Sequence, residues 1–129
     1  MMTNTTHTAV LDVYFQLFDA SRTDERAMEK LLALFTPDVE IVLNGTKRTG
    51  FESFIKAFHQ FNNDIKHMWD SWELQGNGSY QTNWAVCGKT VEGAVYAKTG
   101  IDIAKLTDDG KIIYLENVQD DKNAFKKYE

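Results

Sequence analysis

Near the end of the chain, two apolar runs flank the dipeptide Asp109-Gly110, and this stretch constrains the fold more than any other. Asp-Gly between two such runs is a strong signal for a tight β-hairpin. The runs at 94–106 and 111–119 are therefore predicted to be neighbouring antiparallel strands. Strands of this length twist and curl, so the pattern favours a curved sheet.

Asp102 lies in the middle of the first run, between Ile101 and Ile103. A carboxylate inside an apolar strand costs free energy unless it is exposed, paired or kept protonated. Asp102 is therefore the leading candidate for a functional acid. A structural carboxyl paired with a lysine or a tyrosine is the alternative interpretation.

Hydrophobic spacing in the first half of the chain predicts three amphipathic helices. Thr23 is the expected cap of the second helix, whose apolar face extends to Phe35 and which ends before Pro37. Thr49 and Glu52 match a capping box for the third helix. The three helices are expected at about 6–19, 24–35 and 51–61.

The second half changes to extended runs, after a short first hairpin at 39–48 that turns at Asn44-Gly45. Gly88 and Gly100 lie inside these runs and are candidates for β-bulges. Helices segregated from an antiparallel sheet define the α+β class. We expect one domain over residues 1–129, with loose tails at 1–5 and 121–129. The extended runs are 65–75, 79–91, 94–106 and 111–119.

The composition excludes several classes of protein. The chain is 43% hydrophobic and 26% charged, as in globular proteins, and its net charge of −5 comes without any basic cluster, which argues against nucleic-acid binding. No apolar run approaches the length of a membrane span, and the first residues do not resemble a signal peptide. Cys87 is the single cysteine and is expected to be a buried, inert thiol. These features predict a cytoplasmic protein that does not associate with membranes.

Three short stretches, in their order and spacing, carry a resemblance to a known family. They are Leu32-Ala-Leu-Phe35 before Thr36-Pro37-Asp38, Gly50 before the Phe-rich helix, and Asp109-Gly-Lys-Ile112 before the last strand. Over about residues 8–120 the chain resembles the NTF2-like superfamily, and within it the SnoaL-like polyketide cyclase and ketosteroid isomerase branch. The resemblance implies an α+β cone, in which a curved, mainly antiparallel sheet packs against three helices and encloses an apolar pocket. It also implies a homodimer, which is frequent in this family.

The resemblance also implies roles for two residues. In ketosteroid isomerases, a tyrosine on the first helix and a protonated aspartic acid form an oxyanion hole. Tyr14 resembles that tyrosine, and Asp102 resembles that aspartic acid. The isomerases carry a proton-transferring carboxylate at the end of the first strand, where this chain has Val42-Leu43-Asn44. This departure argues against steroid isomerase activity and leaves a one-acid mechanism, or no chemistry, open.

Further candidates come from the residue pattern. In an extended run His67 and Trp69 share one face, so His67 is a candidate proton shuttle, with a surface or hydrogen-bonded histidine as the alternative. Tyr14 is alternatively a core tyrosine. Three scattered histidines predict no metal site, and we expect no cofactor. The residues expected to line an apolar pocket are Trp69, Trp84, Phe54, Phe58, Leu115 and Asn117.

Two functions of different classes follow. The first is a small enzyme of cyclase, isomerase, dehydratase or hydrolase type, with Asp102, Tyr14 and His67 acting on an apolar, carbonyl-bearing small molecule. The second is a ligand-binding module without turnover. In both, the apolar outer face of the sheet predicts a homodimer. The residues expected on that face are Ile101, Ile103, Ile112 and Tyr114.

Overall fold

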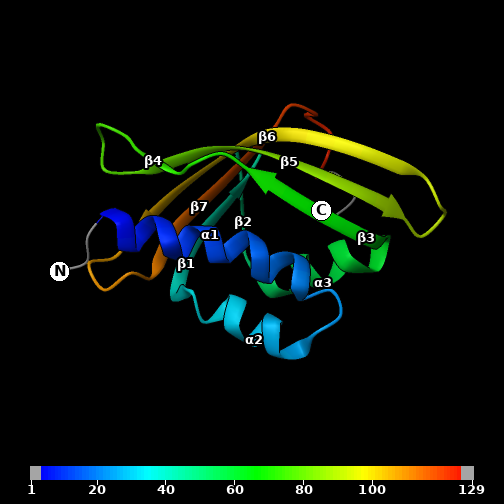
Figure 1. The fold of residues 1–129 in the computed structure, drawn as a ribbon, viewed down its shortest axis with the longest axis horizontal. Coiled ribbons are helices and arrows are strands. Elements are labelled where there is room, and N and C mark those ends of the chain that lie inside the picture. Colours follow the sequence, from blue (N-terminus) through cyan, green and yellow to red (C-terminus); the bar gives the residue numbers. More distant parts are fainter. Residues whose placement is uncertain (1–3, 126–129) are drawn as a thin grey trace.

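The structure is a computed structural model that describes residues 4–125 of the chain. In this part three helices and seven strands follow one another (Figure 1). The helices are α1 (Asn4–Ala20), α2 (Glu25–Leu32) and α3 (Phe51–Phe61). The strands are β1 (Phe35–Leu43), β2 (Thr46–Arg48), β3 (Asn62–Trp69), β4 (Glu73–Leu74), β5 (Tyr80–Thr90), β6 (Val95–Leu106) and β7 (Ile112–Gln119).

One curved, open sheet contains all of these strands. Its order is β2-β1-β7-β6-β5-β3, with β4 paired to β5. Every pair is antiparallel except β1 with β7. The helix α1 packs against α2 and β3, and α3 also packs against β3, so the helices cover one side of the curved sheet (Figure 1). The predicted α+β cone with a mainly antiparallel sheet is therefore confirmed.

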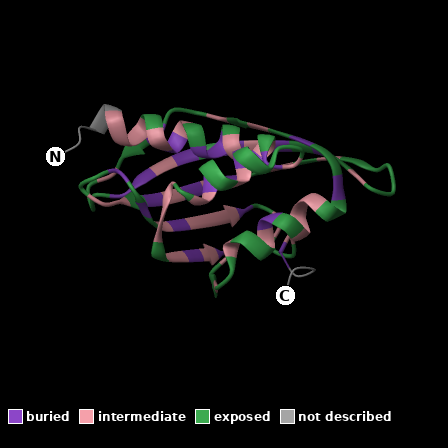
Figure 2. Cartoon of the chain, turned by 90° about the horizontal axis from the view of Figure 1, so that it is seen from below, coloured by how far each residue is buried: buried purple, intermediate pink, exposed green. Residues whose placement is uncertain are grey.

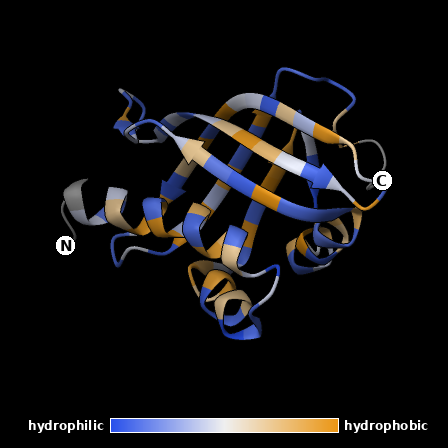
Figure 3. Ribbon diagram, turned by 45° about the vertical axis from the view of Figure 1, so that its right-hand side comes forward, coloured by the Kyte–Doolittle hydropathy of each residue, from blue (hydrophilic) through white to orange (hydrophobic). Residues whose placement is uncertain are grey.

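Side chains alternate between the two faces of the long strands. Buried and more exposed positions succeed one another along β5 and β6, as Figure 2 shows in purple, pink and green. Hydrophobic and hydrophilic residues are mixed along the strands of the sheet (Figure 3). Asp102 on β6 lies on the inner face, opposite Thr82 of β5 and Asn117 of β7. None of the helices in residues 4–125 is long and apolar enough to cross a membrane.

The second helix starts one residue later and ends three residues earlier than the sequence predicted, over Glu25–Leu32 in place of 24–35. Asp24, not Thr23, is its N-cap, and the Asp24 side chain accepts a hydrogen bond from the backbone N–H of Arg26 at 2.9 Å. Phe35 belongs to β1. Pro37 also lies within β1, where the register with β7 shifts between Phe35 and Glu40. A proline is tolerated there because the pairing is irregular, so no regular backbone hydrogen bond is lost with its missing N–H.

The predicted capping box of the third helix does not form. Gly50 is the N-cap of α3, with a left-handed φ of 71°, and no side chain caps the helix. The Glu52 carboxylate instead pairs with Lys56 one turn later at 2.7 Å. Glycine suits this N-cap because it adopts positive φ without a steric penalty.

The prediction of bulges at Gly88 and Gly100 is wrong. The pairing of β5 with β6 runs without a register shift past both residues. Both glycines instead allow a close approach by an aromatic ring, Tyr96 at Gly88 and Trp84 at Gly100. A Cβ at Gly100 would lie 2.6 Å from Cζ2 of Trp84 and would also clash with the carbonyl oxygen of Val118.

Ile112 does not lie on the outer face of the sheet. It is fully buried in the core, whereas Tyr114 faces outward and is half-buried. The cause is an irregularity between β6 and β7, where Lys105 pairs with Tyr114 but Leu106 pairs with Ile112. The extra residue on β7 reverses the inward and outward alternation that the sequence pattern assumed.

Two further expectations differ from the structure. Cys87 is exposed on β5, because it falls on the outer side of a strand whose alternate residues are buried. Residues 121–125 were predicted to be a loose tail, but Asp121 pairs with Lys98 at 2.8 Å and Phe125 is buried. The parts of the predicted tails at 1–3 and 126–129 lie outside the described residues.

We expect Gly100→Ala to lower the free energy of unfolding by roughly 1–3 kcal/mol, because the added methyl group overpacks against Trp84 and the β7 backbone. Urea unfolding measures this change. Gly76→Ala is the matched control, since a Cβ at Gly76 meets no atom within 4 Å. Equal effects of the two substitutions would contradict the packing role of Gly100.

Candidate functional site

A small, mostly apolar cavity lies between α1, α3 and the inner face of the sheet. Its volume is about 40 Å³, which leaves room for only a few water molecules. Aromatic and aliphatic side chains form most of its wall. The polar side chains on the wall are Tyr14, His67, Trp84, Asn117 and Gln119.

Most of the residues predicted from the sequence meet at this inner cavity, although they come from different elements. The helices contribute Tyr14 from α1 and Phe54 and Phe58 from α3. The strands contribute His67, Trp84, Leu115 and Asn117 from β3, β5 and β7.

Trp69 is not among the residues that line the inner cavity. Its ring stacks on Phe15 at a centroid distance of 4.9 Å, and its indole N–H donates to Asp12 of α1 at 2.8 Å. It lies beside a groove that includes the exposed Met68 of the same strand. Trp69 therefore joins α1 to the edge of the sheet.

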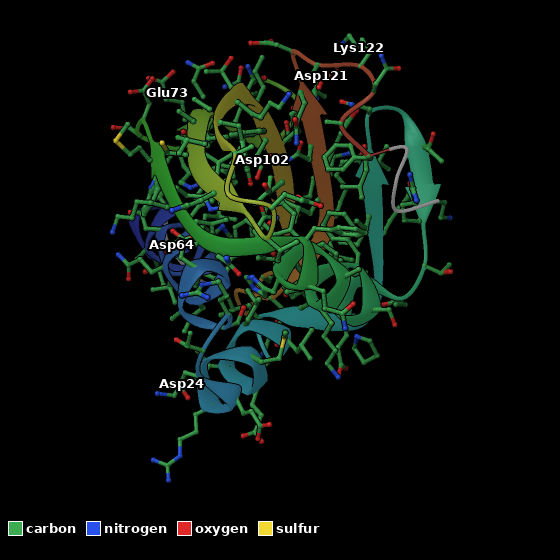
Figure 4. The ribbon with its side chains drawn as sticks, turned by 90° about the vertical axis from the view of Figure 1, so that its right-hand side faces the viewer. Asp24, Asp64, Glu73, Asp102, Asp121 and Lys122 are labelled. Carbon is green, nitrogen blue, oxygen red and sulfur yellow. The ribbon has the colours of Figure 1, made fainter. Side chains whose placement is uncertain are left out.

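Asp102 is fully buried, and neither of its carboxyl oxygens makes a hydrogen bond within the described residues. Figure 4 shows it inside the curve of the sheet, whereas Asp64, Glu73 and Asp24 lie at the periphery. The neighbouring hydroxyl of Thr82 donates elsewhere, to the carbonyl oxygen of Asp70 at 2.9 Å. Asp102 is not itself among the lining residues, but its neighbours Trp84 and Asn117 are.

Burial controls the protonation of Asp102. Desolvation raises the pKa of its carboxyl to about 8, and the polar groups of Trp84 and Asn117 offset part of this rise. No cation or hydroxyl of residues 4–125 pairs with the carboxyl, so the alternative of a structural carboxyl paired with Lys or Tyr has no support in this part of the chain. Burial instead favours the neutral carboxylic acid over the carboxylate.

Tyr14 is 5% exposed and lines the inner cavity from α1. Burial raises the pKa of its hydroxyl well above the usual value, and the nearby carboxyls of Asp102 and Asp19 raise it further. Tyr14 therefore keeps its proton at all ordinary pH values and can only donate it in a hydrogen bond or accept one.

His67 is held by a carboxylate that the sequence analysis missed. Asp19, near the end of α1, accepts from the backbone N–H of His67 at 2.8 Å and contacts its Nδ1 at 2.5 Å. A carboxylate oxygen at Nδ1 fixes the proton there, which leaves Nε2 unprotonated in the neutral ring. An acidic residue in the last turn of a helix is unfavourable for the helix dipole, and this signal could have identified Asp19.

Metal binding has no evident basis in residues 4–125. No group of three or more histidine, cysteine, aspartate or glutamate side chains is arranged there to hold an ion. The site instead combines a histidine ring held by a carboxylate, a buried carboxyl whose pKa is raised and a buried phenol around an apolar space. Such a set can move a proton and stabilise a developing negative charge on oxygen.

Comparison with solved structures identifies the family. An NTF2-like protein of unknown function from Exiguobacterium sp. 255-15 is 46% identical in sequence, with a TM-score of 0.83 over 87% of this chain and 98% of that one. The chain belongs to the NTF2-like family. No family model and no curated protein matches its sequence.

Two more distant structures share the fold of this NTF2-like protein. A candidate isomerase of the SnoaL-like family from Agrobacterium tumefaciens is 16% identical, with a TM-score of 0.66 over 90% of this chain and 98% of that one. SalBIII, an epoxide hydrolase/cyclase-like enzyme in pyran ring formation in the polyether salinomycin, is 13% identical, with a TM-score of 0.71 over 92% and 94%. At such identities the likeness concerns the fold alone.

The raised pKa of Asp102 makes the stability of this NTF2-like protein depend on pH. The unfolded carboxyl ionises near its ordinary pKa of about 4, and the folded one near 8. Between these values the folded state binds more protons, so the free energy of unfolding falls as pH rises through this window. We expect Asp102→Asn to remove this slope and to be at least as stable as the wild type at pH 8.

Thermal melts from pH 4 to pH 9 measure this slope. Asp64→Asn is the control, because it removes one carboxylate from an exposed position on β3. A wild-type profile that Asp102→Asn leaves unchanged, or a large loss of stability in that variant at pH 8, would show that the buried carboxyl is ionised in the folded protein.

Proposed function

We propose that this NTF2-like protein is an enzyme that transfers a proton on an apolar, carbonyl-bearing small molecule, as cyclases, isomerases, dehydratases and hydrolases do. The observation that carries the proposal is the Asp19-held ring of His67 on the wall of the apolar cavity, with Tyr14 on the same wall and Asp102 next to it. The first group is suited to accept a proton, and the other two are suited to donate hydrogen bonds.

The proposed step is an enolisation. Nε2 of His67 takes a proton from the carbon next to the carbonyl, and the electrons of that C–H bond form a carbon–carbon double bond. The carbonyl oxygen takes up the negative charge and is stabilised by hydrogen bonds from Tyr14 and the protonated Asp102. Asp19 is a positioning residue, since it acts through His67 by fixing the tautomer and orientation of the ring.

A substrate enters only when the cavity widens, because 40 Å³ is much smaller than a typical ligand pocket. The same movement has to bring Asp102 into contact with the substrate, past Trp84 and Asn117. One observation favours a second function, the binding of a ligand without turnover: Asp102 is not among the residues that line the inner cavity.

Exchange of α-protons tests the enzymatic proposal. We expect the protein in D₂O to speed the loss of the α-proton signals of 2-tetralone, an apolar bicyclic ketone, measured by proton NMR. His67→Gln should lower this rate by about 100-fold, because the general base is lost. Asp19→Asn should give a smaller loss and a shifted pH profile, because the ring remains but its tautomer is no longer fixed.

The matched control is His59→Gln, since His59 bonds to Ser21 at 3.0 Å and does not line the cavity. Quenching of tryptophan fluorescence by 2-tetralone measures binding separately in each variant. If 2-tetralone binds but exchanges at the buffer rate, the enzymatic proposal fails and binding without turnover is supported.

We also infer a homodimer formed through the outer face of the sheet. Ile101, Ile103 and Val118 are half-buried there in the isolated chain, next to a Tyr114 hydroxyl that donates to Glu116 at 2.8 Å. The ammonium of Lys105 lies 5.2 Å from the centre of the Tyr114 ring. An apolar centre with a polar rim is typical of interfaces between subunits.

We expect Ile103→Lys to convert the dimer to a monomer at micromolar concentration, because a lysine would be buried against its own symmetry mate. Light scattering coupled to gel filtration measures the mass. Val95→Lys is the control on the same strand, at a position that is 75% exposed. A wild-type protein of monomer mass would disprove the dimer.

A further inference from the structure

A second and larger cavity lies beside the inner one. It has a volume of about 470 Å³ and is bounded on one side by residues 121–125. Four side chains line both cavities and separate them: Phe58, Val86, Gln119 and Phe125. The larger cavity, called the outer chamber below, has the size of a small-molecule site, which the inner cavity does not have.

The outer chamber contains a cation. Among the described residues that line the two cavities, Lys98 is the one lysine or arginine. It lies on the inner face of β6, four residues before Asp102, with Gly100 between them. At about 3.3 Å per strand residue, the two Cα atoms are roughly 13 Å apart. The inner face of β6 thus carries two groups. The ammonium of Lys98 lies in the outer chamber, and the buried carboxyl of Asp102 lies next to the residues that line the inner cavity.

The partner of Lys98 can be exchanged at little cost. Its ammonium lies 2.8 Å from Oδ2 of Asp121, and both side chains are more than a third exposed. Ion pairs this exposed contribute little to stability. A carboxylate on a ligand could therefore replace that of Asp121 without a large loss of free energy.

Asp121 also holds the segment that closes the chamber. Its carbonyl oxygen accepts from the side-chain amide of Asn44 at 3.2 Å, and four residues later Phe125 packs on Phe54 with ring centroids 5.8 Å apart. The carbonyl oxygen of Phe125 also accepts from the Arg48 guanidinium at 3.3 Å, so release of Asp121 from Lys98 would remove one of several contacts that keep Phe125 in the wall between the two cavities. Binding of an anion at Lys98 would therefore favour the opening of the inner cavity but would not complete it alone.

We propose that the substrate is an elongated, apolar molecule with a carboxylate at one end and its reacting carbonyl at the other. Lys98 binds the carboxylate in the outer chamber, and the carbonyl reaches Tyr14 and Asp102 once Phe125 moves aside. This inference rests on the proposed function, because it adds the anionic end and the length of the substrate to the acid–base site.

The test compares benzoylnonanoate with its methyl ester, which have the same apolar body and differ in charge. We expect isothermal titration calorimetry to show about tenfold tighter binding of the acid, as for a charge-assisted hydrogen bond. Lys98→Met should abolish this preference without changing the affinity for the ester. Asp121→Asn should raise the affinity for the acid alone, because it removes the competing carboxylate.

Lys66→Met is the matched control, since it removes an equal charge from an exposed position on β3. Lys98→Arg should retain the preference for the acid, which shows that the variants are folded and that the charge is what matters. The proposal is overturned if Lys98→Met lowers the affinities for acid and ester equally, or changes neither, because the ion pair is then only an anchor for the segment.

Failure of this inference and failure of the proposed function give different results. If the protein prefers the acid in a Lys98-dependent way but does not exchange its α-protons, Lys98 binds the carboxylate in the outer chamber as proposed, and the enzymatic proposal fails. If the α-protons of 2-tetralone exchange in a His67-dependent way but benzoylnonanoate binds no better than its ester, the enzymatic proposal is supported and the anionic substrate is excluded.

Discussion

One carboxyl, that of Asp102, is buried on the central part of the sheet and has no charged partner among residues 4–125. Asp102 lies on β6, between β5 and β7, and is fully buried on the inner face of the sheet. Because burial raises its pKa to about 8, ionising it at pH 7 costs about 1.4 kcal/mol, similar to the loss of one hydrogen bond, so the protonated form is favoured. The surrounding polar groups moderate this condition but do not remove it.

The aromatic core and the candidate site are one and the same packing arrangement. Phe15 stacks on Trp69 and Trp72 and also contacts the ring of His67. The rings that hold α1 against the sheet therefore also fix the histidine that faces the inner cavity. Tight packing leaves only a small space there, and Phe125, from the segment after β7, lies in the wall between this space and the outer chamber. In the proposed function, chemistry and access are therefore assigned to different parts of the cone.

Local sequence patterns predicted the order of the main elements and half of the residues on the wall of the inner cavity. The turn at Asp109-Gly110 predicted the strand that carries Asp102, and the family resemblance placed this carboxyl at the pocket, where it is buried on the inner face. The expected alternation of side chains failed for Ile112, because one extra residue in β7 reverses it. It also misjudged Gly100, where an aromatic ring from the adjacent strand, and not a bulge, requires a residue without a side chain.

By itself, the sequence determined the family and the order of helices and strands, because these depend on periodicity and turn residues within short stretches. The burial of Asp102 was decided by the tertiary structure. Only the tertiary structure decided which groups meet. Asp19 and His67 are 48 residues apart, and their contact exists because α1 lies along β3. Lys98 and Asp121 likewise meet only where the chain after β7 returns across the mouth of the cone. Contacts of this kind are set by the curvature and register of the sheet, and no local pattern encodes them.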